Sequence, residues 1–290
     1  MGRLVRSREA GHVTDSNVRV RALTWNLFHG RDFPPEPELL TWRSRLLRIT
    51  EQGATHAQVN RDLLDEFTEV LARSEWDVAL LQECPPRWTV PLARRLGAHP
   101  HRALTSRNSL APLRAVAARL NPDLVASAEG GSNLTLVRDG APLECRELVL
   151  CPGPTPERRV MAFTRMESGV CVANLHASAG AANRARAEDE LRLAAETSIR
   201  WAAGRALILG GDLNVRPRDS PIYDELAERF GLAAPTAPGA LDHLLCRGLG
   251  TLEAPAGWPE AGRDVAWDGL LLRLSDHAPV EALFAAPDRG

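Results

Sequence analysis

The sequence contains no lysine, and all 35 of its basic residues are arginine. Because arginine replaces lysine throughout, a single arginine carries little functional weight on its own. The net charge of −2 provides no global excess of positive charge to hold nucleic acid, although a local basic cleft stays open. With 44% hydrophobic and 25% charged residues, the composition is that of an ordinary globular protein.

Cysteine-based and serine-based chemistry also lack support. The five cysteines are odd in number and widely spaced, with no C-x-x-C pair and no Cys/His cluster. This pattern argues against a disulfide framework and against a structural zinc site. No G-x-S-x-G elbow is present, so a serine hydrolase is not indicated.

Membrane and targeting signals are missing as well. The first residues, MGRLVRSREAGHVTDSN, contain no apolar core of signal-peptide length, and no segment is apolar over the length that spans a bilayer. No long apolar hairpin suggests insertion at a membrane interface. We therefore expect a cytoplasmic protein with no membrane anchor, and no obligate protein partner is evident.

The chain has no internal repeat, and its Pro/Gly-rich segments have the size of loops. We expect a flexible arm over residues 1–16 and a single domain over 17–290, because this length can bury one substantial core.

Apolar runs and helical stripes alternate along the chain. Strands are predicted at 18–27, 77–83, 133–139, 144–151, 159–166, 170–177, 206–209, 241–248 and 277–284. Helices are predicted at 38–49, 59–74, 88–96, 112–120, 183–204 and 220–230. Many strands with few long helices favour an α/β fold of two packed sheets with helices outside, over a doubly wound single sheet.

Polar side chains follow several of these apolar strands. In GGDLNVRP, Asp212 and Asn214 are separated by one residue, so in an extended chain both side chains point the same way. Similar clusters follow the other strands and comprise Asn26, Glu83, Asn174, His176, Asp276 and His277, while Asp242 and His243 lie inside or just before a strand. A charged group at a strand tip is costly to bury without a partner, so these positions are candidates for a site.

Each cluster alone also has a structural explanation, as a turn, a solvated strand end or a hydrogen-bonded core histidine. Together they offer carboxylate and amide ligands, which suit Mg²⁺ or Mn²⁺. A histidine beside a carboxylate can hold or transfer a proton. Phosphodiester hydrolysis needs a cation, a positioned water and donors for the growing negative charge. Glycoside hydrolysis has less use for the histidines and amides.

Six motifs occur in a familiar order: WNLFHG, LLQE, NLHA, GGDLN, LDHLL and SDHAPV. In this order they resemble the endonuclease/exonuclease/phosphatase superfamily, which includes pancreatic deoxyribonuclease and exonuclease III-type enzymes. The likeness runs from about residue 18 to 284. It implies a four-layer α/β/β/α sandwich of two packed mixed sheets flanked by helices, with the active site at one edge of the sheets.

The resemblance also implies roles for individual residues. Glu83 matches the principal metal ligand and Asn26 the amide beside it, while Asp276 is placed at a metal or its water shell. Asp212 matches the aspartate that positions or deprotonates the attacking water, and Asn214 a residue that contacts phosphate.

Histidines complete the implied site. His277 matches the histidine that acts on the phosphate or the water, and Asp242 the aspartate that orients it. His176 matches a second histidine that helps to hold the phosphate. Further phosphate contacts are assigned to Asn174, Asn133 and Arg216, the last with a solvated loop as its alternative.

The resemblance implies a Mg²⁺- or Mn²⁺-dependent phosphodiester hydrolase in which water attacks phosphorus. Nucleic acid is the favoured substrate class, and the enzyme could be an endonuclease or an exonuclease. NLHA stands where exonuclease III-type repair enzymes carry Y-x-P-N, which argues against abasic-site repair. The alternative is a phosphatase or phosphodiesterase of small phosphoesters or phospholipid head groups. A catalytically silent binding module is less favoured, since such a module has no need of the retained carboxylates and histidine.

Overall fold

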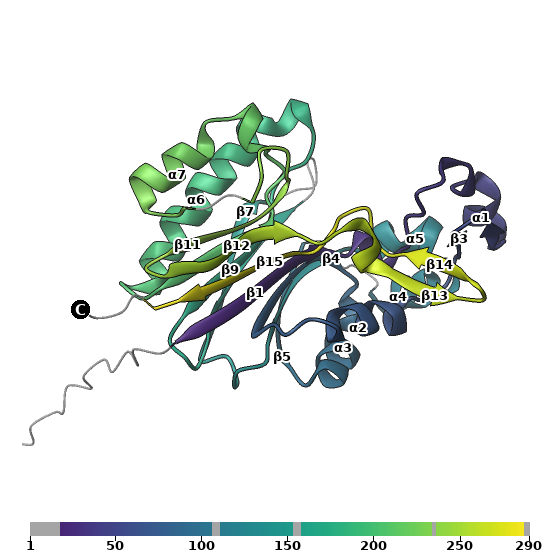
Figure 1. Cartoon of the computed structure of the whole chain (residues 1–290), viewed down its shortest axis with the longest axis horizontal. Helices are drawn as coiled ribbons and strands as arrows, with labels where there is room; N and C mark the ends of the chain where they lie inside the picture. The colour runs from purple at the N-terminus through teal and green to yellow at the C-terminus, as the bar shows by residue number, and fades with distance from the viewer. Residues whose placement is uncertain (1–17, 106–110, 153–157, 234–235, 287–290) are drawn as a thin grey trace, which may run out of the picture.

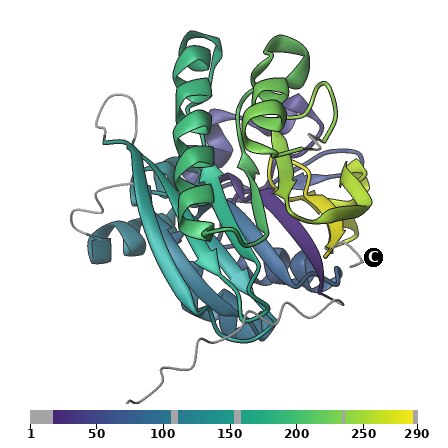
Figure 2. The same ribbon diagram turned by 90° about the vertical axis from the view of Figure 1, so that its left-hand side faces the viewer.

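The computed structural model describes residues 18–105, 111–152, 158–233 and 236–286, so the predicted arm at 1–16 lies outside the described residues. Two β-sheets pack face to face, and helices cover the outer face of each (Figures 1 and 2). This arrangement confirms the predicted sandwich of two mixed sheets flanked by helices. No helix among the described residues is both long and apolar enough to cross a membrane.

The first sheet has six strands in the order β12-β15-β1-β4-β6-β5. Within it β1 and β4 are parallel, and the other neighbours are antiparallel. Its strands are β1 (Arg19–Asn26), β4 (Val78–Cys84), β5 (His99–Leu104), β6 (Ser132–Val137), β12 (Gly250–Gly257) and β15 (Val280–Ala285).

The second sheet has five strands in the order β11-β10-β9-β8-β7, with β9 and β10 parallel and the rest antiparallel. Its strands are β7 (Glu144–Cys151), β8 (Arg159–Arg165), β9 (Cys171–His176), β10 (Leu207–Asp212) and β11 (Asp242–Arg247). Each sheet thus contains one central parallel pair, whose carboxyl ends meet at one edge.

Helices form the two outer layers. The second sheet is covered by α6 (Arg184–Ala202) and α7 (Ile222–Phe230), and the first by α2 (Leu64–Ala72) and α3 (Thr89–Leu96). The remaining elements gather at one end of the molecule (Figure 1): α1 (Trp42–Leu47), α4 (Ala111–Leu120), α5 (Pro122–Glu129), β2 (Glu51–Gln52), β3 (Ala57–Gln58), β13 (Asp264–Trp267) and β14 (Leu270–Arg273).

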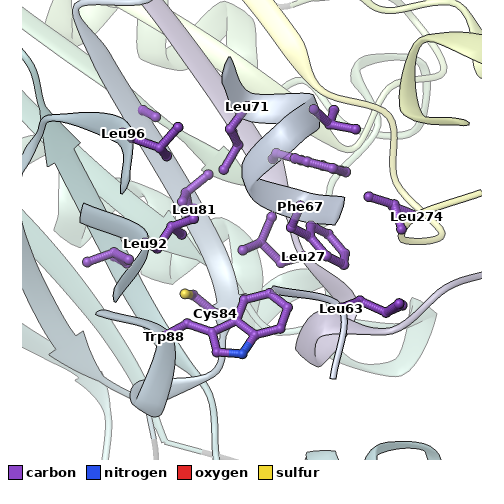
Figure 3. Packing of buried hydrophobic residues seen from close by; sticks show 14 of the residues in the cluster. Leu27, Leu63, Phe67, Leu71, Leu81, Cys84, Trp88, Leu92, Leu96 and Leu274 are labelled. Carbon is purple, nitrogen blue, oxygen red and sulfur yellow. The ribbon is translucent and has the colours of Figure 1, made fainter. Parts of the chain in front are cut away.

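Three apolar layers hold the sandwich together. Side chains such as Leu80, Val172 and Ile208 fill the space between the sheets. Under α2 and α3, the rings of Phe67 and Trp88 pack 5.3 Å apart between centroids, with Leu27 beside them (Figure 3). Burial of large apolar side chains on both faces of each sheet is the main force that stabilises the fold.

The close approach of β9 and β10 requires a glycine at position 211. Gly211 has φ +139°, and a Cβ atom there would lie 1.8 Å from the Leu175 carbonyl oxygen. Gly211→Ala is therefore expected to lower the free energy of unfolding by about 3 kcal/mol or more, measured by equilibrium unfolding in urea.

Gly257→Ala is the matched control, because a Cβ atom there meets nothing within 4 Å. Its free energy of unfolding is expected to change by less than about 0.5 kcal/mol. Equal unfolding midpoints for the two variants would show that β9 and β10 do not approach as described.

Several element boundaries differ from the predictions. The helix expected at 59–74 begins only at Leu64, because Asp32 accepts a hydrogen bond from the Val59 amide and Asn60 donates to the Ser44 carbonyl. The stretch 38–49 is divided, since Thr41 accepts from backbone amides and starts α1 at Trp42. The strand expected at 277–284 begins at Val280. The predictions omitted β2, β3, β5, β12, β13, β14 and α5.

Candidate active site

Two carboxylate side chains, Asp242 and Asp212, and one imidazole, His176, form a row across the second sheet. Asp212 pairs with His176 in the parallel β9–β10 register and with Asp242 in the antiparallel β10–β11 register. In the first sheet, Asn26 ends β1, and Glu83 lies near the end of the adjoining β4. Because the sheets pack face to face, the two sets of strand ends meet at one edge, and residues from across the chain share one site.

His277 is paired with Asp242. Its Nδ1 lies 2.6 Å from Asp242 Oδ2, which orients the ring so that Nε2 points away from the pair and lies 3.9 Å from Asp212 Oδ2. Burial alone would lower the pKa of His277, but the hydrogen bond and charge of Asp242, together with the charge of Asp212, raise it to about 10. The imidazole is thus a cation at neutral pH.

Asp276 and His277 lie in a loop that follows an apolar strand, as predicted, but His277 lies outside the strand that was predicted at 277–284. The loop lies between β14 and β15 and is fixed to the first sheet. Trp25 Nε1 donates to the His277 carbonyl at 2.8 Å, and Ser275 Oγ donates to the Asn26 carbonyl at 2.6 Å. The loop is thereby held against the end of β1.

Asp212 is 2% exposed and lies at the centre of the row. Its carboxylate accepts hydrogen bonds from Asn26 Nδ2 at 2.9 Å and from the Asn214 amide at 3.2 Å. Burial raises the pKa of Asp212, and the negative charge of Asp242 raises it further. A carboxyl group in this state can accept a proton more readily than an exposed one.

His176 is held between Arg159 and Asp212. Arg159 Nη1 lies 3.2 Å from His176 Nδ1, and Asp212 Oδ2 lies 3.4 Å from Nε2. A guanidinium only donates, so Nδ1 must accept and Nε2 carries the proton directed at Asp212. Burial, and then the charge of Arg159, lower the pKa of His176 well below its usual value, which keeps the ring neutral.

The Glu83 side chain projects from the first sheet toward His29 and His176. Its Oε2 lies 3.2 Å from His29 Nε2, and its Oε1 lies 4.0 Å from His176 Nδ1. Burial raises the pKa of Glu83, while the charges of His277 and Arg159 oppose this effect. The site therefore holds a carboxylate that is largely removed from water.

The backbone is strained where the site residues are presented. Positive φ angles occur at Phe28, His29, Glu83, Asn214 and Ser275, all next to or within the site. Such conformations cost about 1–3 kcal/mol each for residues other than glycine and are held in place by the surrounding structure. Their concentration at one edge is typical of a functional site.

Asn214 and Arg216 continue the site past the end of β10. Asn214 Nδ2 donates to the Ala177 carbonyl at 3.0 Å, and both residues line a pocket of about 240 Å³. Asp276 Oδ1 lies 4.0 Å from His277 Nε2, and burial raises the pKa of Asp276. These placements agree with an extended site around Asp212.

Asn174 and Asn133 do not face this site, which corrects the sequence-based expectation of phosphate contacts. Both are 0% exposed between the sheets. Asn174 Oδ1 accepts from Gln82 at 2.8 Å and its Nδ2 donates to the Leu81 carbonyl, so it bridges the two sheets. Asn133 Nδ2 donates to the Val160 carbonyl at 2.6 Å. Burial leaves neither amide accessible to a substrate.

Two residues of the site were missed from the sequence. His29 lies within the WNLFHG motif, but its approach to Glu83 depends on the positive φ angles of Phe28 and His29. Arg159 begins β8 and is 8% exposed, yet nothing in the sequence distinguishes it from the other arginines. Of these two residues, only His29 had a signal in the sequence, because it lies in the WNLFHG motif.

The oxygen donors at this edge fit a hard divalent cation. Glu83 and Asn26 offer a carboxylate and an amide oxygen beside each other, and Asp276 adds a second carboxylate. A different set, Asp212, Asp242 and His277, has ligand atoms within 4.8 Å of one another. In that set the Asp242–His277 hydrogen bond engages one atom of each residue, and in the first set the Asn26 oxygen likewise accepts from the Phe28 amide at 2.9 Å. The preference for Glu83 and Asn26 therefore rests on the resemblance of their motifs.

The sequence model of the Endonuclease/Exonuclease/phosphatase family matches residues 23–277. No curated protein matches the sequence.

Similar solved structures cover most of the chain. An endonuclease/exonuclease/phosphatase family protein from Bacteroides thetaiotaomicron has 14% identity and a TM-score of 0.60, covering 93% of this chain and 99% of its own. A mannosyl-6-phosphatase from the same organism has 13% identity and a TM-score of 0.61, with 92% and 99% covered. TDP2 from Caenorhabditis elegans has 15% identity and a TM-score of 0.56, with 92% and 75% covered. With a family match over most of its length and this fold, the chain belongs to the endonuclease/exonuclease/phosphatase family of phosphoesterases.

Proposed function

We propose that the protein is a divalent-metal-dependent phosphodiester hydrolase, with nucleic acid as the favoured substrate class. The observation that carries the proposal is the meeting of Glu83 and Asn26 from one sheet with Asp212, Asp242 and His277 at the same edge. Phosphoryl transfer to water requires carboxylates that bind a cation, a base that activates the water and a cationic donor that contacts the phosphate.

Asp212 is proposed to position the attacking water and to take its proton as the oxygen bonds to phosphorus. Its carboxylate is itself oriented by Asn26 and Asn214. His176, whose Nε2–H points at Asp212, is assigned to positioning this carboxylate in place of a direct phosphate contact. Asn214 remains the proposed phosphate contact on this side of the site.

His277 is proposed to donate from Nε2 to a phosphate oxygen on which negative charge grows. Asp242 holds Nδ1 and so keeps the ring in this orientation. The P–O bond to the leaving group then breaks, the leaving oxygen takes a proton from a solvent water, and Asp212 returns the proton that it accepted to solvent. Preorganised donors aimed at the developing charge are typically the largest single contribution to such catalysis.

Mg²⁺ or Mn²⁺ would be held by Glu83 and Asn26, with Asp276 at the ion or its water shell. When bound, the ion neutralises phosphate oxygens and thereby favours attack by water. We expect EDTA to stop hydrolysis of bis-p-nitrophenyl phosphate and of plasmid DNA, with activity restored by Mg²⁺ or Mn²⁺. Continued hydrolysis in EDTA would contradict metal dependence.

Glu83→Gln is expected to weaken Mg²⁺ binding at least about tenfold, because an amide replaces the charged ligand. The measurement is the Mg²⁺ concentration that gives half-maximal activity. Glu167→Gln is the matched control, since Glu167 is exposed in the turn between β8 and β9, at the opposite end of these strands. An unchanged Mg²⁺ dependence in Glu83→Gln would remove this residue from the metal site.

The alternative is hydrolysis of small phosphoesters or phospholipid head groups, since the same site chemistry serves these substrates. The mannosyl-6-phosphatase is one protein of this fold named for a small substrate. Salt separates the two classes: affinity for a polyanion falls steeply with added salt, whereas affinity for a small ester changes little. We expect a steep salt dependence of KM for DNA or RNA, measured beside bis-p-nitrophenyl phosphate. A flat dependence would favour the alternative.

A further inference from the structure

The pocket beside Asn214 is built from segments that adjoin catalytic positions. Its volume is about 240 Å³, and its lining residues are Gly180, Ala181, Arg184, Asn214, Val215, Arg216, Asp219 and Leu241. Gly180 follows the strand that ends in His176, Asn214 lies two residues after Asp212, and Leu241 precedes Asp242. Asn214 links the two, because it lines the pocket and its backbone amide donates to Asp212 Oδ1 at 3.2 Å, so the pocket adjoins the proposed catalytic centre.

Two guanidinium groups line this pocket. Arg184 begins α6 and donates to the Asp219 carbonyl at 3.4 Å, and Arg216 is half-buried beside Asn214. Within the described parts of the chain, neither forms an ion pair with a carboxylate. Arg192, further along the same helix, shows the contrast, because it pairs with Glu225 at 2.9 Å and with Asp189 at 2.9 Å.

The pocket has one carboxylate among its described lining residues, that of Asp219. This carboxylate is turned toward Arg218, whose Nε lies 3.8 Å from Oδ1. The pocket therefore presents two positive charges and one negative charge that already has a partner. Arg184 is exposed and Arg216 is half-buried, so both can turn their N–H donors toward a ligand in the pocket. An anionic ligand suits this lining best, because it can accept charge-assisted hydrogen bonds from both guanidinium groups.

The size of the pocket limits the ligand. Pockets for whole small molecules measure roughly 300–1,000 Å³, so a volume of about 240 Å³ suits one part of a larger substrate. We propose that this pocket binds a second phosphate group of the substrate, next to the phosphate that is hydrolysed, through Arg184 and Arg216. The inference rests on the proposed phosphodiesterase function and narrows its substrates to molecules that carry two neighbouring phosphates.

The test uses two chromogenic substrates that differ only in the second phosphate. Thymidine 5′-(p-nitrophenyl phosphate) has one phosphorus, and its 3′-phosphorylated form has two; the isomeric pair with the ester at the 3′ position is run in parallel. We expect the doubly phosphorylated form of one pair to have at least about tenfold higher kcat/KM, which is the effect of one charge-assisted contact. Arg184→Ala should bring the ratio within the pair close to one.

Arg186→Ala is the matched control, because Arg186 is an exposed arginine on the same helix outside the pocket. It should leave the ratio unchanged. Equal kcat/KM values within both pairs in the unmodified protein, or equal ratios in Arg184→Ala and the unmodified protein, would overturn the proposal.

A binding measurement separates this proposal from the proposed function. Thymidine 3′,5′-bisphosphate should bind at least about tenfold more tightly than both monophosphates by calorimetry, and Arg184→Ala should remove the difference. If no ester is hydrolysed but this difference holds, the phosphodiesterase function fails and the phosphate pocket stands. Hydrolysis without any difference in binding would refute the pocket alone.

A further substrate identifies the source of the second phosphate. A short oligonucleotide with a neutral methylphosphonate next to the cleaved linkage is compared with its normal counterpart. Slower cleavage of the neutral form, lost in Arg184→Ala, identifies a nucleic-acid backbone. If only the bisphosphate nucleoside shows the dependence, the pocket serves a small doubly phosphorylated molecule.

Discussion

His277→Ala is expected to lower kcat for phosphodiester hydrolysis by about 10³-fold, because it removes the cationic donor proposed to face the phosphate. The far-ultraviolet circular dichroism spectrum should stay unchanged, since the side chain lies in a loop and is 16% exposed. Asp242 loses its partner, so the free energy of unfolding is expected to fall by about 1–3 kcal/mol. A near-normal rate would remove His277 from the mechanism.

A double-mutant cycle with Asp242→Asn separates a catalytic loss from a structural one. If Asp242 acts only by orienting His277 through the 2.6 Å contact, its substitution should matter little once His277 is absent. The double variant should then be about as slow as His277→Ala alone, as is usual for residues that act as one unit. Fully additive losses would contradict the pairing.

Asp212→Asn is expected to lower kcat by about 10³-fold as well, because the proposed acceptor of the water proton is lost. Unlike His277→Ala, this variant is not expected to lower the free energy of unfolding strongly. Burial and the charge of Asp242 raise the pKa of Asp212, so its ionised form costs stability at neutral pH. In EDTA-treated protein, relief of this cost should offset the hydrogen bond that the amide nitrogen cannot accept, so the free energy of unfolding should change by less than about 1 kcal/mol.

Urea unfolding and steady-state kinetics on the same preparation provide this test. A slow and equally stable Asp212→Asn variant would show that the buried carboxylate serves function at the expense of stability. A slow variant that is destabilised by several kcal/mol would indicate that Asp212 is needed mainly for folding, through its contacts with Asn26 and His176. A fast variant would exclude it as the proposed base.

The sequence predicted the elements that position the site. Strands β1, β4, β9 and β10 are short apolar runs that end in polar residues, and the structure places their ends at one edge. The physical reason is simple: strands buried on both faces are almost continuously apolar, so a polar residue marks where each strand leaves the core. The meeting of these ends was therefore predictable once two packed sheets were assumed.

The same property explains why Asn174 was misplaced. Every residue of β9 is buried, so the sequence shows no alternation that would tell the face toward the other sheet from the face toward the helices. Asn174 and His176 point to the same side of the strand, yet Asn174 meets Gln82 inside the sandwich and His176 reaches the edge. Only the position along the strand separates the structural amide from the site histidine.

The remaining omissions have other causes. β12 is mostly exposed and contains Pro255, so it lacks the apolar pattern by which strands were identified. β13 and β14 are four residues each, too short for a periodic signal. Arg159 is a site residue through a contact between strand ends, and a composition rich in arginine hides such a residue.

The central claim is that side chains from both sheets hold a cation and a phosphoryl group together at one edge. The most direct test is a crystal structure with Mn²⁺ and phosphate, with the ion located by its anomalous scattering. We predict Mn²⁺ at the Glu83 carboxylate and the Asn26 amide oxygen, with a phosphate oxygen on His277 Nε2. Mn²⁺ bound between Asp212, Asp242 and His277 with nothing at Glu83, or phosphate held away from His277, would contradict the account.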